Sequence, residues 1–282
     1  FALAGFGALG FIDDRTKVFK GAHGVSKRAK MALQFGVGIA CATWFVAIDS
    51  AWVIDQVKAF ESGGRWFWDV AARHEVRGAI SLPFVGLEHA VPAGWGLALW
   101  ALLLTFACSN SVNFTDGMDG LAAGTMLIAA LAFMVIAYLA SHFVASHYLG
   151  ILHVPGCQEV AVFCAALAGG CLGFLWFNAH PAEVFMGDTG SQALGGALAV
   201  VALCCKQEFL ILLVGSVFFL EGLSVLLQVG YFRATGGKRL FLCAPIHHHF
   251  QYLGWPETKI VLRAWITAAL TALLALATLK LR

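Results

Sequence analysis

The stretch Asn113–Ser141, NFTDGMDGLAAGTMLIAALAFMVIAYLAS, decides the fold class. Its last 21 residues carry no charge and are long enough to cross a bilayer as a helix, which takes about 20 residues. Its first eight residues instead hold Asn113, Asp116 and Asp119, spaced three apart. Ionisable groups are costly to hold at a membrane boundary, so a cluster there indicates a functional site. The stretch predicts a membrane protein with a polar site at the end of a span.

The composition of the whole chain supports this prediction. Of the 282 residues, 60% are hydrophobic and 12% are charged, and the mean hydropathy is +0.81. A soluble domain typically has about 25% charged residues. We therefore expect a single polytopic membrane domain over residues 1–282. The net charge of +2 shows none of the strongly basic character of nucleic-acid binders, so no nucleic-acid partner is expected.

Apolar runs along the chain predict an all-α, multi-spanning fold with about eight transmembrane helices, the first of them partial. Residues 1–12 are too short to span, and we interpret them as the tail of a longer helix that closes at Asp13-Asp14. The run 191–205 is short and contains Gly195 and Gly196, which predicts a helix packed tightly inside the protein. The other runs are 31–48, 95–112, 121–141, 160–177, 209–231 and 260–279.

Basic residues predict the orientation of these helices. Segment 12–30 holds six Lys or Arg residues and segment 232–263 holds five, together 11 of the 18 in the chain. The positive-inside rule assigns both segments to the cytoplasm. Counting crossings then places four loops on that side: 12–30, 110–121, 178–191 and 232–258. Residues 49–93 fall outside, where we expect a hairpin or surface helix anchored by Trp52, Trp66, Trp68 and Trp95.

Acidic residues supply two candidate groups within these loops. Adjacent carboxylates repel, so Asp13-Asp14 needs a cation, a metal or a hydrogen-bond donor nearby; the alternative is a solvated helix end. Asp188 lies between glycines at the start of the short helix, where it could bind Mg²⁺ together with substrate phosphates. It could equally serve as the N-terminal cap of that helix.

Amide and histidine side chains extend the candidate site. Gly117 and Gly120 let the segment after Asn113 turn sharply or approach a phosphate, although Asp-Gly is also common in plain turns. The triplet His247–His249 cannot direct three adjacent imidazoles at one ion, which favours phosphate binding over a metal site; the alternative is an interfacial histidine run. Glu221, Ser224 and Gln228 share one helical face, where substrate contact and polar helix packing are both open.

Four motifs, taken in order, resemble one family. They are GFIDD at 10–14, NFTDGMDGL at 113–121, FMGDTGS at 185–191 and APIHHHF at 244–250. The chain is similar over nearly its whole length to the polyprenyl-phosphate N-acetylhexosamine-1-phosphate transferases. That resemblance implies a ten-helix fold, of which this chain would supply the last eight helices, so the chain is interpreted as N-terminally truncated. The uninterrupted triplet and the sequence GWPETKIV at 254–261 favour the branch that uses UDP-N-acetylmuramoyl-pentapeptide.

The resemblance also implies the chemistry. This is an Mg²⁺-dependent phosphoglycosyl transfer in peptidoglycan biosynthesis at the cytoplasmic face of the bacterial inner membrane. Phospho-N-acetylmuramoyl-pentapeptide passes from UDP to undecaprenyl phosphate, giving lipid I and UMP, and a homodimer is expected. The alternative within the family is a UDP-N-acetylglucosamine enzyme. An ion-coupled transporter is a remote alternative, which predicts acidic groups near the bilayer midplane.

Residue roles follow from the same motifs. Asp13 and Asp14 resemble the family's catalytic acidic pair, one acting as base or nucleophile, and Asp188 resembles its magnesium ligand. Lys30, after Gly24-x-x-x-Arg28, matches a basic residue near phosphate. The expected nucleotide-sugar contacts are Asn113, Asp116, Asp119, Asn178, Phe185, Gln228, Ala244, His247, His248 and His249.

Overall fold

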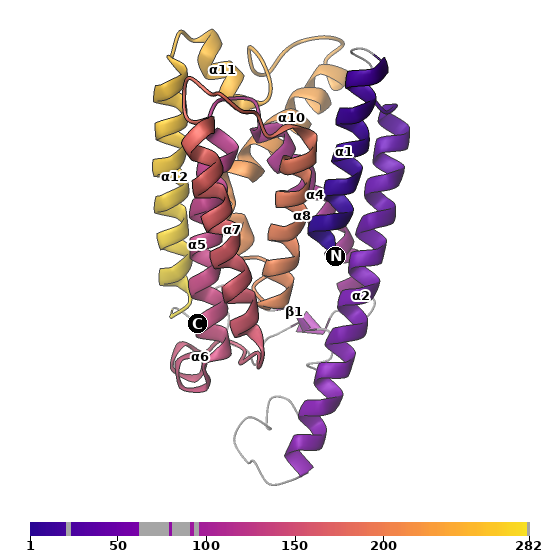
Figure 1. The fold of residues 1–282 in the computed structure, drawn as a ribbon, viewed down its shortest axis with the longest axis vertical. Coiled ribbons are helices and arrows are strands. Elements are labelled where there is room, and N and C mark those ends of the chain that lie inside the picture. Colours follow the sequence, from indigo (N-terminus) through magenta and orange to yellow (C-terminus); the bar gives the residue numbers. More distant parts are fainter. Residues whose placement is uncertain (21–23, 62–78, 81–90, 93–95, 281–282) are drawn as a thin grey trace.

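A computed structural model describes residues 1–20, 24–61, 79–80, 91–92 and 96–280. These residues form a bundle of long helices that run roughly along one axis (Figure 1). The long helices are α1 (Ala2–Lys20), α2 (Lys27–Glu61), α4 (Gly96–Thr115), α5 (Leu121–Ser141), α7 (Cys157–Asn178), α8 (Gly187–Cys204), α10 (Ser216–Ala234) and α12 (Glu257–Thr278). The short helices are α6 (Phe143–Leu149), α9 (Ile211–Val214) and α11 (Ile246–Tyr252).

The predicted all-α, multi-spanning class is confirmed. Six helices within the described residues are long and apolar enough to cross a membrane, in α2, α4, α5, α7, α10 and α12. The bundle also contains α1 and α8, which complete the eight predicted helices. The predicted run 209–231 forms two helices, because the chain is interrupted at Gly215 between α9 and α10.

The predicted ends of the first two helices were wrong, since α2 also continues past residue 48 to Glu61. Helix α1 does not close at Asp13-Asp14 but continues to Lys20. Lys17 lies three and four residues after the two aspartates, so one turn of helix brings its ammonium group against both carboxylates. Such pairs at i,i+3 and i,i+4 stabilise a helix. The acidic pair therefore lies within a continuing helix rather than at its end.

Helix α8 is the tightly packed central helix that the sequence predicted. It packs against both α1 and α4. Glycines permit the close approach: an added Cβ at Gly10 would lie 2.6 Å from the Thr189 Cα, and one at Gly195 would lie 2.5 Å from the Cys108 carbonyl oxygen. The consequence is that the first turn of α8 lies directly against the acidic half of α1.

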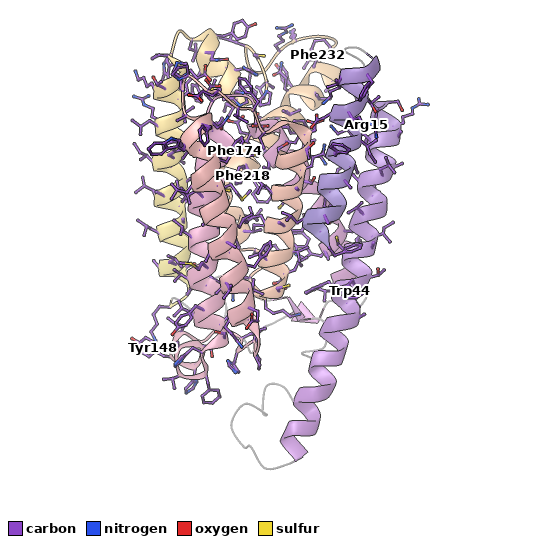
Figure 2. The ribbon with its side chains drawn as sticks, viewed as in Figure 1. Arg15, Trp44, Tyr148, Phe174, Phe218 and Phe232 are labelled. Carbon is purple, nitrogen blue, oxygen red and sulfur yellow. The ribbon has the colours of Figure 1, made fainter. Side chains whose placement is uncertain are left out.

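The outer surface of the bundle is apolar. Large hydrophobic side chains are exposed on its helices, among them Trp44 on α2 (Figure 2). Leu270 on α12 is exposed as well. The buried core is also apolar and includes Phe133, Leu198 and Phe218. A bundle with an apolar exterior as well as an apolar core is suited to a lipid environment.

Both ends of the bundle carry loops, but the predicted polar segments gather at one of them. The C-terminal end of α1, the start of α8 and helix α11 lie at the upper end in Figure 1. Strands β1 (Ala79–Ile80) and β2 (Val91–Pro92) pair antiparallel toward the other end, with Ala79 opposite Pro92. Most of the predicted external stretch 49–93 lies outside the described residues, as do Trp66, Trp68 and Trp95; the Trp52 side chain is likewise not described.

Candidate functional site

Three carboxylates and two lysines meet where α1, α2 and α8 converge. This acid–lysine cluster consists of Asp13, Asp14, Lys17, Lys30 and Asp188. Both ammonium groups contact the same oxygen, Asp188 Oδ2, at 2.8 Å from Lys17 and 2.5 Å from Lys30. The three carboxylates offer ligand oxygens that all lie within 4.8 Å of one another. The expectation that the acidic pair needs a cation, a metal or a hydrogen-bond donor nearby is met by the two lysines.

Electrostatics keep Asp188 and Lys17 ionised. Burial of Asp188 opposes its ionisation, but contacts with Asp13, Lys17 and Lys30 outweigh burial and hold the pKa of Asp188 well below its ordinary value. Partial burial lowers the pKa of Lys17, but its contacts with Asp188 and Asp13 raise that pKa well above its ordinary value. A negative carboxylate and a positive ammonium therefore face each other near neutral pH.

Asp13 is the most buried member of the cluster. Its Oδ1 accepts a hydrogen bond of 2.8 Å from the Val25 N–H, so the chain after α1 folds back over it. Its Oδ2 lies 3.0 Å from Lys17 Nζ and 3.2 Å from Lys30 Nζ. Both oxygens are thus engaged by protein donors, which makes Asp13 an anchor for the two lysines.

Asp14 holds the N-terminus of α8. Its Oδ2 accepts 2.8 Å and 2.7 Å hydrogen bonds from the Thr189 N–H and Oγ1–H. Asp188 lies in the first turn of the helix and does not cap it, so the capping alternative considered for Asp188 does not apply. A carboxylate at a helix N-terminus is stabilised by the unpaired N–H groups and the helix dipole.

The donor set of the cluster fits a magnesium ion. Mg²⁺ is commonly bound through one or two carboxylates, with substrate phosphates and waters completing its octahedron. Asp188 and the acidic pair supply such oxygens, and no soft sulfur or imidazole ligand belongs to the group. The three carboxylates therefore form a candidate metal site, in which Lys17, Lys30 and Asn113 contact the Asp188 carboxylate.

The last turn of α4 and the segment after it join the cluster as predicted. Asn113 Nδ2 donates to Asp188 Oδ1 at 2.6 Å and to Ser191 Oγ at 2.9 Å. Asp116 accepts a hydrogen bond from the Gly187 N–H, and burial together with the nearby Asp188 charge raises the pKa of Asp116 to about 6. Asn113 and Asp116 therefore belong to the surroundings of Asp188.

Asp119 and Asn178 lie in a neighbouring group rather than in the cluster. Asp119 Oδ2 lies 3.1 Å from His180 Nδ1 and accepts a 3.0 Å hydrogen bond from the Ala182 N–H, while Glu257 accepts from the Asp119 N–H. Asn178 is buried; its oxygen accepts from the Gly120 N–H at 3.1 Å and its amide donates to the Val184 carbonyl at 2.8 Å. Asn178 thus fixes two site loops to each other.

The histidine triplet turns its three imidazoles in different directions. His247 is 1% exposed, and its Nδ1 lies 3.0 Å from Glu221 Oε2 of α10. His248 contacts Gln251, and His249 accepts from the Leu242 N–H at 3.2 Å. The expectation that one ion could not hold all three is confirmed. Among the described residues His247 Nε2 has no hydrogen-bond partner, and it lies 2.5 Å from where a Cβ on Gly117 would be, so His247 faces the 113–120 segment.

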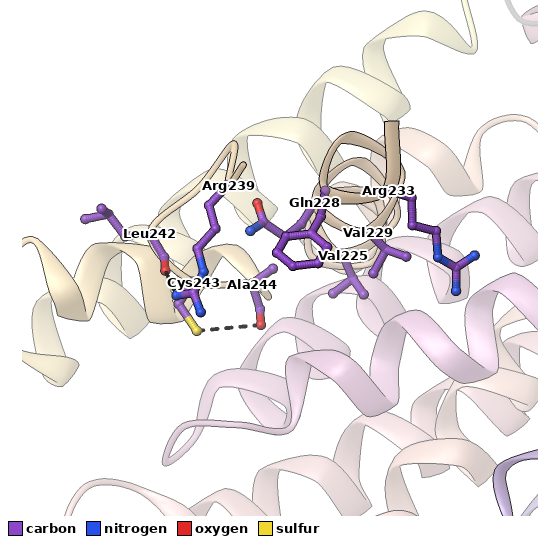
Figure 3. A pocket seen from close by; sticks show the side chains of 9 residues that line it. Val225, Gln228, Val229, Arg233, Arg239, Leu242, Cys243 and Ala244 are labelled. Carbon is purple, nitrogen blue, oxygen red and sulfur yellow. Dashed lines mark hydrogen bonds between the residues drawn. The ribbon is translucent and has the colours of Figure 1, made fainter. Parts of the chain in front are cut away.

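Gln228 and Ala244 line a pocket of about 390 Å³ between α10 and the loop before α11 (Figure 3). Gln228 Oε1 accepts from the Leu240 and Phe241 N–H groups, so this side chain positions the loop. Arg233 and Arg239 also line the pocket and give it positive charge. Phe185 stands 73% exposed just before α8, available to a ligand from solution.

Sequence reasoning missed several site residues. Lys17 was not assigned a role, although its spacing from Asp13 and Asp14 placed it on their helical face. Thr189 and Glu257 gave no signal, because the contacts they make, with Asp14 and the Asp119 N–H, join segments more than 100 residues apart. Glu221 was left open between substrate contact and helix packing, and it pairs with His247.

Comparisons with known proteins identify the family of this chain. Residues 1–206 match the description "Glycosyl transferase family 4", which defines the class of protein. The chain is 45% identical over 279 residues to the phospho-N-acetylmuramoyl-pentapeptide-transferase of Desulfotalea psychrophila, covering 98% of this chain and 70% of the relative. The enzymes so named from Desulfosudis oleivorans and Nitratidesulfovibrio vulgaris are 47% and 45% identical, over 100% and 99% of this chain and 71% of each relative. Within its class, the chain belongs to the phospho-N-acetylmuramoyl-pentapeptide-transferase family.

Proposed function

We propose that the chain transfers phospho-N-acetylmuramoyl-pentapeptide from UDP to undecaprenyl phosphate, which forms lipid I and releases UMP. The observation that carries this proposal is the 43–47% identity to enzymes of that name over nearly the whole chain. The acid–lysine cluster lies at the end of the bundle, where a lipid phosphate from the membrane can meet a nucleotide from water. We propose that this end faces the cytoplasm of a bacterial inner membrane, because 11 of the 18 basic residues belong to its segments.

The reaction exchanges one phosphoanhydride for another. An oxygen of undecaprenyl phosphate forms a bond to the sugar-proximal phosphorus, and the bond from that phosphorus to the oxygen of UMP breaks. Catalysis of such a transfer is mostly positioning and charge neutralisation. Mg²⁺, held by Asp188 with the acidic pair, would supply Lewis-acid stabilisation of the diphosphate. Lys17 and Lys30 add positive charge at the same place.

The remaining predicted residues would hold the nucleotide sugar. Asn113 and Asp116 border the metal side of the site, and Asp119, Asn178 and the exposed Phe185 border the loop before α8. His247, His248, His249, Gln228 and Ala244 would contribute from α10, α11 and the loop between them. Because Asn178 and Gln228 already bond to backbone groups, we propose that they act by shaping their loops.

Direct attack by the lipid phosphate is the mechanism that the geometry favours. A phosphate monoester is already largely ionised near pH 7, so it needs little help from a base. Asp13 is buried with both oxygens engaged, and Asp14 Oδ2 is occupied by Thr189. We therefore expect no phosphorylated aspartate when the protein is incubated with the nucleotide substrate and Mg²⁺ alone. Trapping such an adduct by mass spectrometry would overturn direct attack.

Substrate choice is tested by comparing nucleotide sugars. We expect UMP release with UDP-N-acetylmuramoyl-pentapeptide and undecaprenyl phosphate. With UDP-N-acetylglucosamine in its place, we expect turnover at least about 100-fold lower, the discrimination available from missing polar contacts. Faster turnover of UDP-N-acetylglucosamine would instead support the alternative branch of the family. A homodimer, implied by the family resemblance, is tested by light scattering of the detergent-solubilised protein.

A further inference from the structure

The acid–lysine cluster already holds two ammonium groups against its carboxylates. A divalent cation cannot bind there unless at least one of these groups changes its position. Lys17 Nζ lies 2.8 Å from Asp188 Oδ2, 3.0 Å from Asp13 Oδ2 and 3.4 Å from Asp14 Oδ1. It thereby contacts all three carboxylates that could ligate a divalent cation. An ammonium group at this point and a divalent cation on the same oxygens would repel each other strongly at such short range.

The two lysines differ in how easily they can leave. The Lys17 side chain is 41% exposed, and that of Lys30 is 22% exposed. Lys17 projects from the last turns of α1, where three carboxylates are its only ion-pair partners among the described residues. Lysine carries a compact charge on a flexible four-carbon stem, so its ammonium group can change partners without movement of the helix. Lys17 is therefore the member that can move aside.

We propose that Lys17 is an exchange residue: its ammonium group neutralises the three carboxylates before metal binds, and then moves to the substrate phosphates. This proposal rests on the proposed transfer reaction and deepens it, because it assigns Lys17 to the phosphate-bearing substrates. The displaced ammonium stays within reach of the cluster, where lipid phosphate and diphosphate bring several negative charges together. Lys30, more buried and bonded to both Asp13 and Asp188, keeps its place in the cluster.

Metal binding without substrates tests the first half of the proposal. Mn²⁺, which electron paramagnetic resonance detects directly, would be titrated into the detergent-solubilised wild type, Lys17→Met, Lys17→Arg and Arg15→Met. Removing the competing ammonium should tighten Mn²⁺ binding by Lys17→Met about tenfold, whereas Lys17→Arg should bind Mn²⁺ about as the wild type does. Arg15 is an exposed cation on the same helix that packs over Phe19, so Arg15→Met controls for loss of one positive charge.

Transfer kinetics test the second half. Lys17→Met should transfer more slowly with a raised KM for undecaprenyl phosphate despite its tighter metal binding, and Arg15→Met should match the wild type. Lysine acylation followed by mass spectrometry tests the exchange in the unmutated protein. Mg²⁺ should increase labelling of Lys17 and leave that of Lys30 unchanged.

Each result decides one of the two proposals. Unchanged Mn²⁺ affinity in Lys17→Met, or Lys17 labelling that does not respond to Mg²⁺, overturns the exchange even if the wild type forms lipid I. If the wild type forms no lipid I with any nucleotide sugar, the proposed function fails instead. Should Lys17→Met not fold, the acylation measurement on the wild type decides the exchange alone.

Discussion

Asp14 of α1 accepts two hydrogen bonds from Thr189 of α8, one from its N–H at 2.8 Å and one from its hydroxyl at 2.7 Å. This pair fixes the first turn of α8, and with it Asp188, against the acidic helix. Thr189→Ala removes the hydroxyl donor and should lower the free energy of unfolding by about 1 kcal/mol. Thermal unfolding in detergent measures the change.

A matched control distinguishes this contact from general loss of a threonine. Thr43 lies on α2 and is exposed, and among the described residues its hydroxyl bonds only to carbonyls of its own helix, Ile39 and Ala40. Thr43→Ala should therefore leave stability nearly unchanged. Equal effects of the two substitutions would contradict the role of the Asp14–Thr189 pair.

Gly10 sets the distance between α1 and α8. An added Cβ would lie 2.6 Å from the Thr189 Cα and would also overlap the Asp188 backbone. Gly10→Ala should therefore destabilise the protein by about 1–3 kcal/mol or more, the usual cost of overpacking a tight interface. Gly36 on α2 has no neighbour within 4 Å of an added Cβ, so Gly36→Ala should be neutral or slightly stabilising. Tolerance of both substitutions would show that the helices do not approach this closely.

The sequence predicted the fold well because each long apolar run had to become a helix in lipid. Counting the membrane crossings also placed Asp188, Asn113 and the acidic pair on the same side of the membrane. Sequence reasoning missed the continuation of α1 beyond Asp14, because a charged segment after an apolar run resembles a helix end. Only the structure shows that Lys17 uses that extra turn to reach the acidic pair.

Asp116 should make stability depend on pH. Its pKa is raised from 3.8 to about 6 by burial and by the nearby Asp188 charge, so the folded state binds this proton more tightly than the unfolded state does. The stabilising contribution is fully present below pH 3.8 and is lost as the pH rises through about 6. Asp116→Asn mimics the protonated form and does not titrate.

The comparison is made by melting metal-free wild type and Asp116→Asn between pH 4.5 and pH 7.5, a range set by the two pKa values. As the pH rises across this interval, the melting temperature of the variant should increase by about 2–4 °C relative to that of the wild type. A difference between the two proteins that does not change with pH would contradict the raised pKa. Work without divalent ions is essential, because a bound cation reverses the local charge balance.

Glu221 and His247 form a buried pair 3.0 Å apart that joins α10 to α11. Replacing either by alanine leaves the other buried without its partner, so each substitution should cost about 1–3 kcal/mol. The double variant should cost less than the sum by at least about 0.5 kcal/mol, since the two losses share one interaction. Additive costs in thermal unfolding would mean that the pair does not hold α11.

The distribution of roles among the histidines and Gln228 could not be predicted from the sequence. Adjacent residues differ in direction by about 100° on a helix, but which one faces the core depends on partners far along the chain. His247 faces inward because its imidazole pairs with the carboxylate of Glu221, which lies 26 residues earlier in the chain. Gln228 similarly bonds to Leu240 and Phe241, a loop whose path no local pattern determines.

The central claim is Mg²⁺-dependent transfer at Asp188. The most direct measurement is lipid I and UMP formation from UDP-N-acetylmuramoyl-pentapeptide and undecaprenyl phosphate, with Mg²⁺ or with EDTA. The wild type should turn over only with Mg²⁺, and Asp188→Asn should be at least about 100-fold slower. Turnover in EDTA, or an Asp188→Asn rate equal to that of the wild type, would contradict the claim.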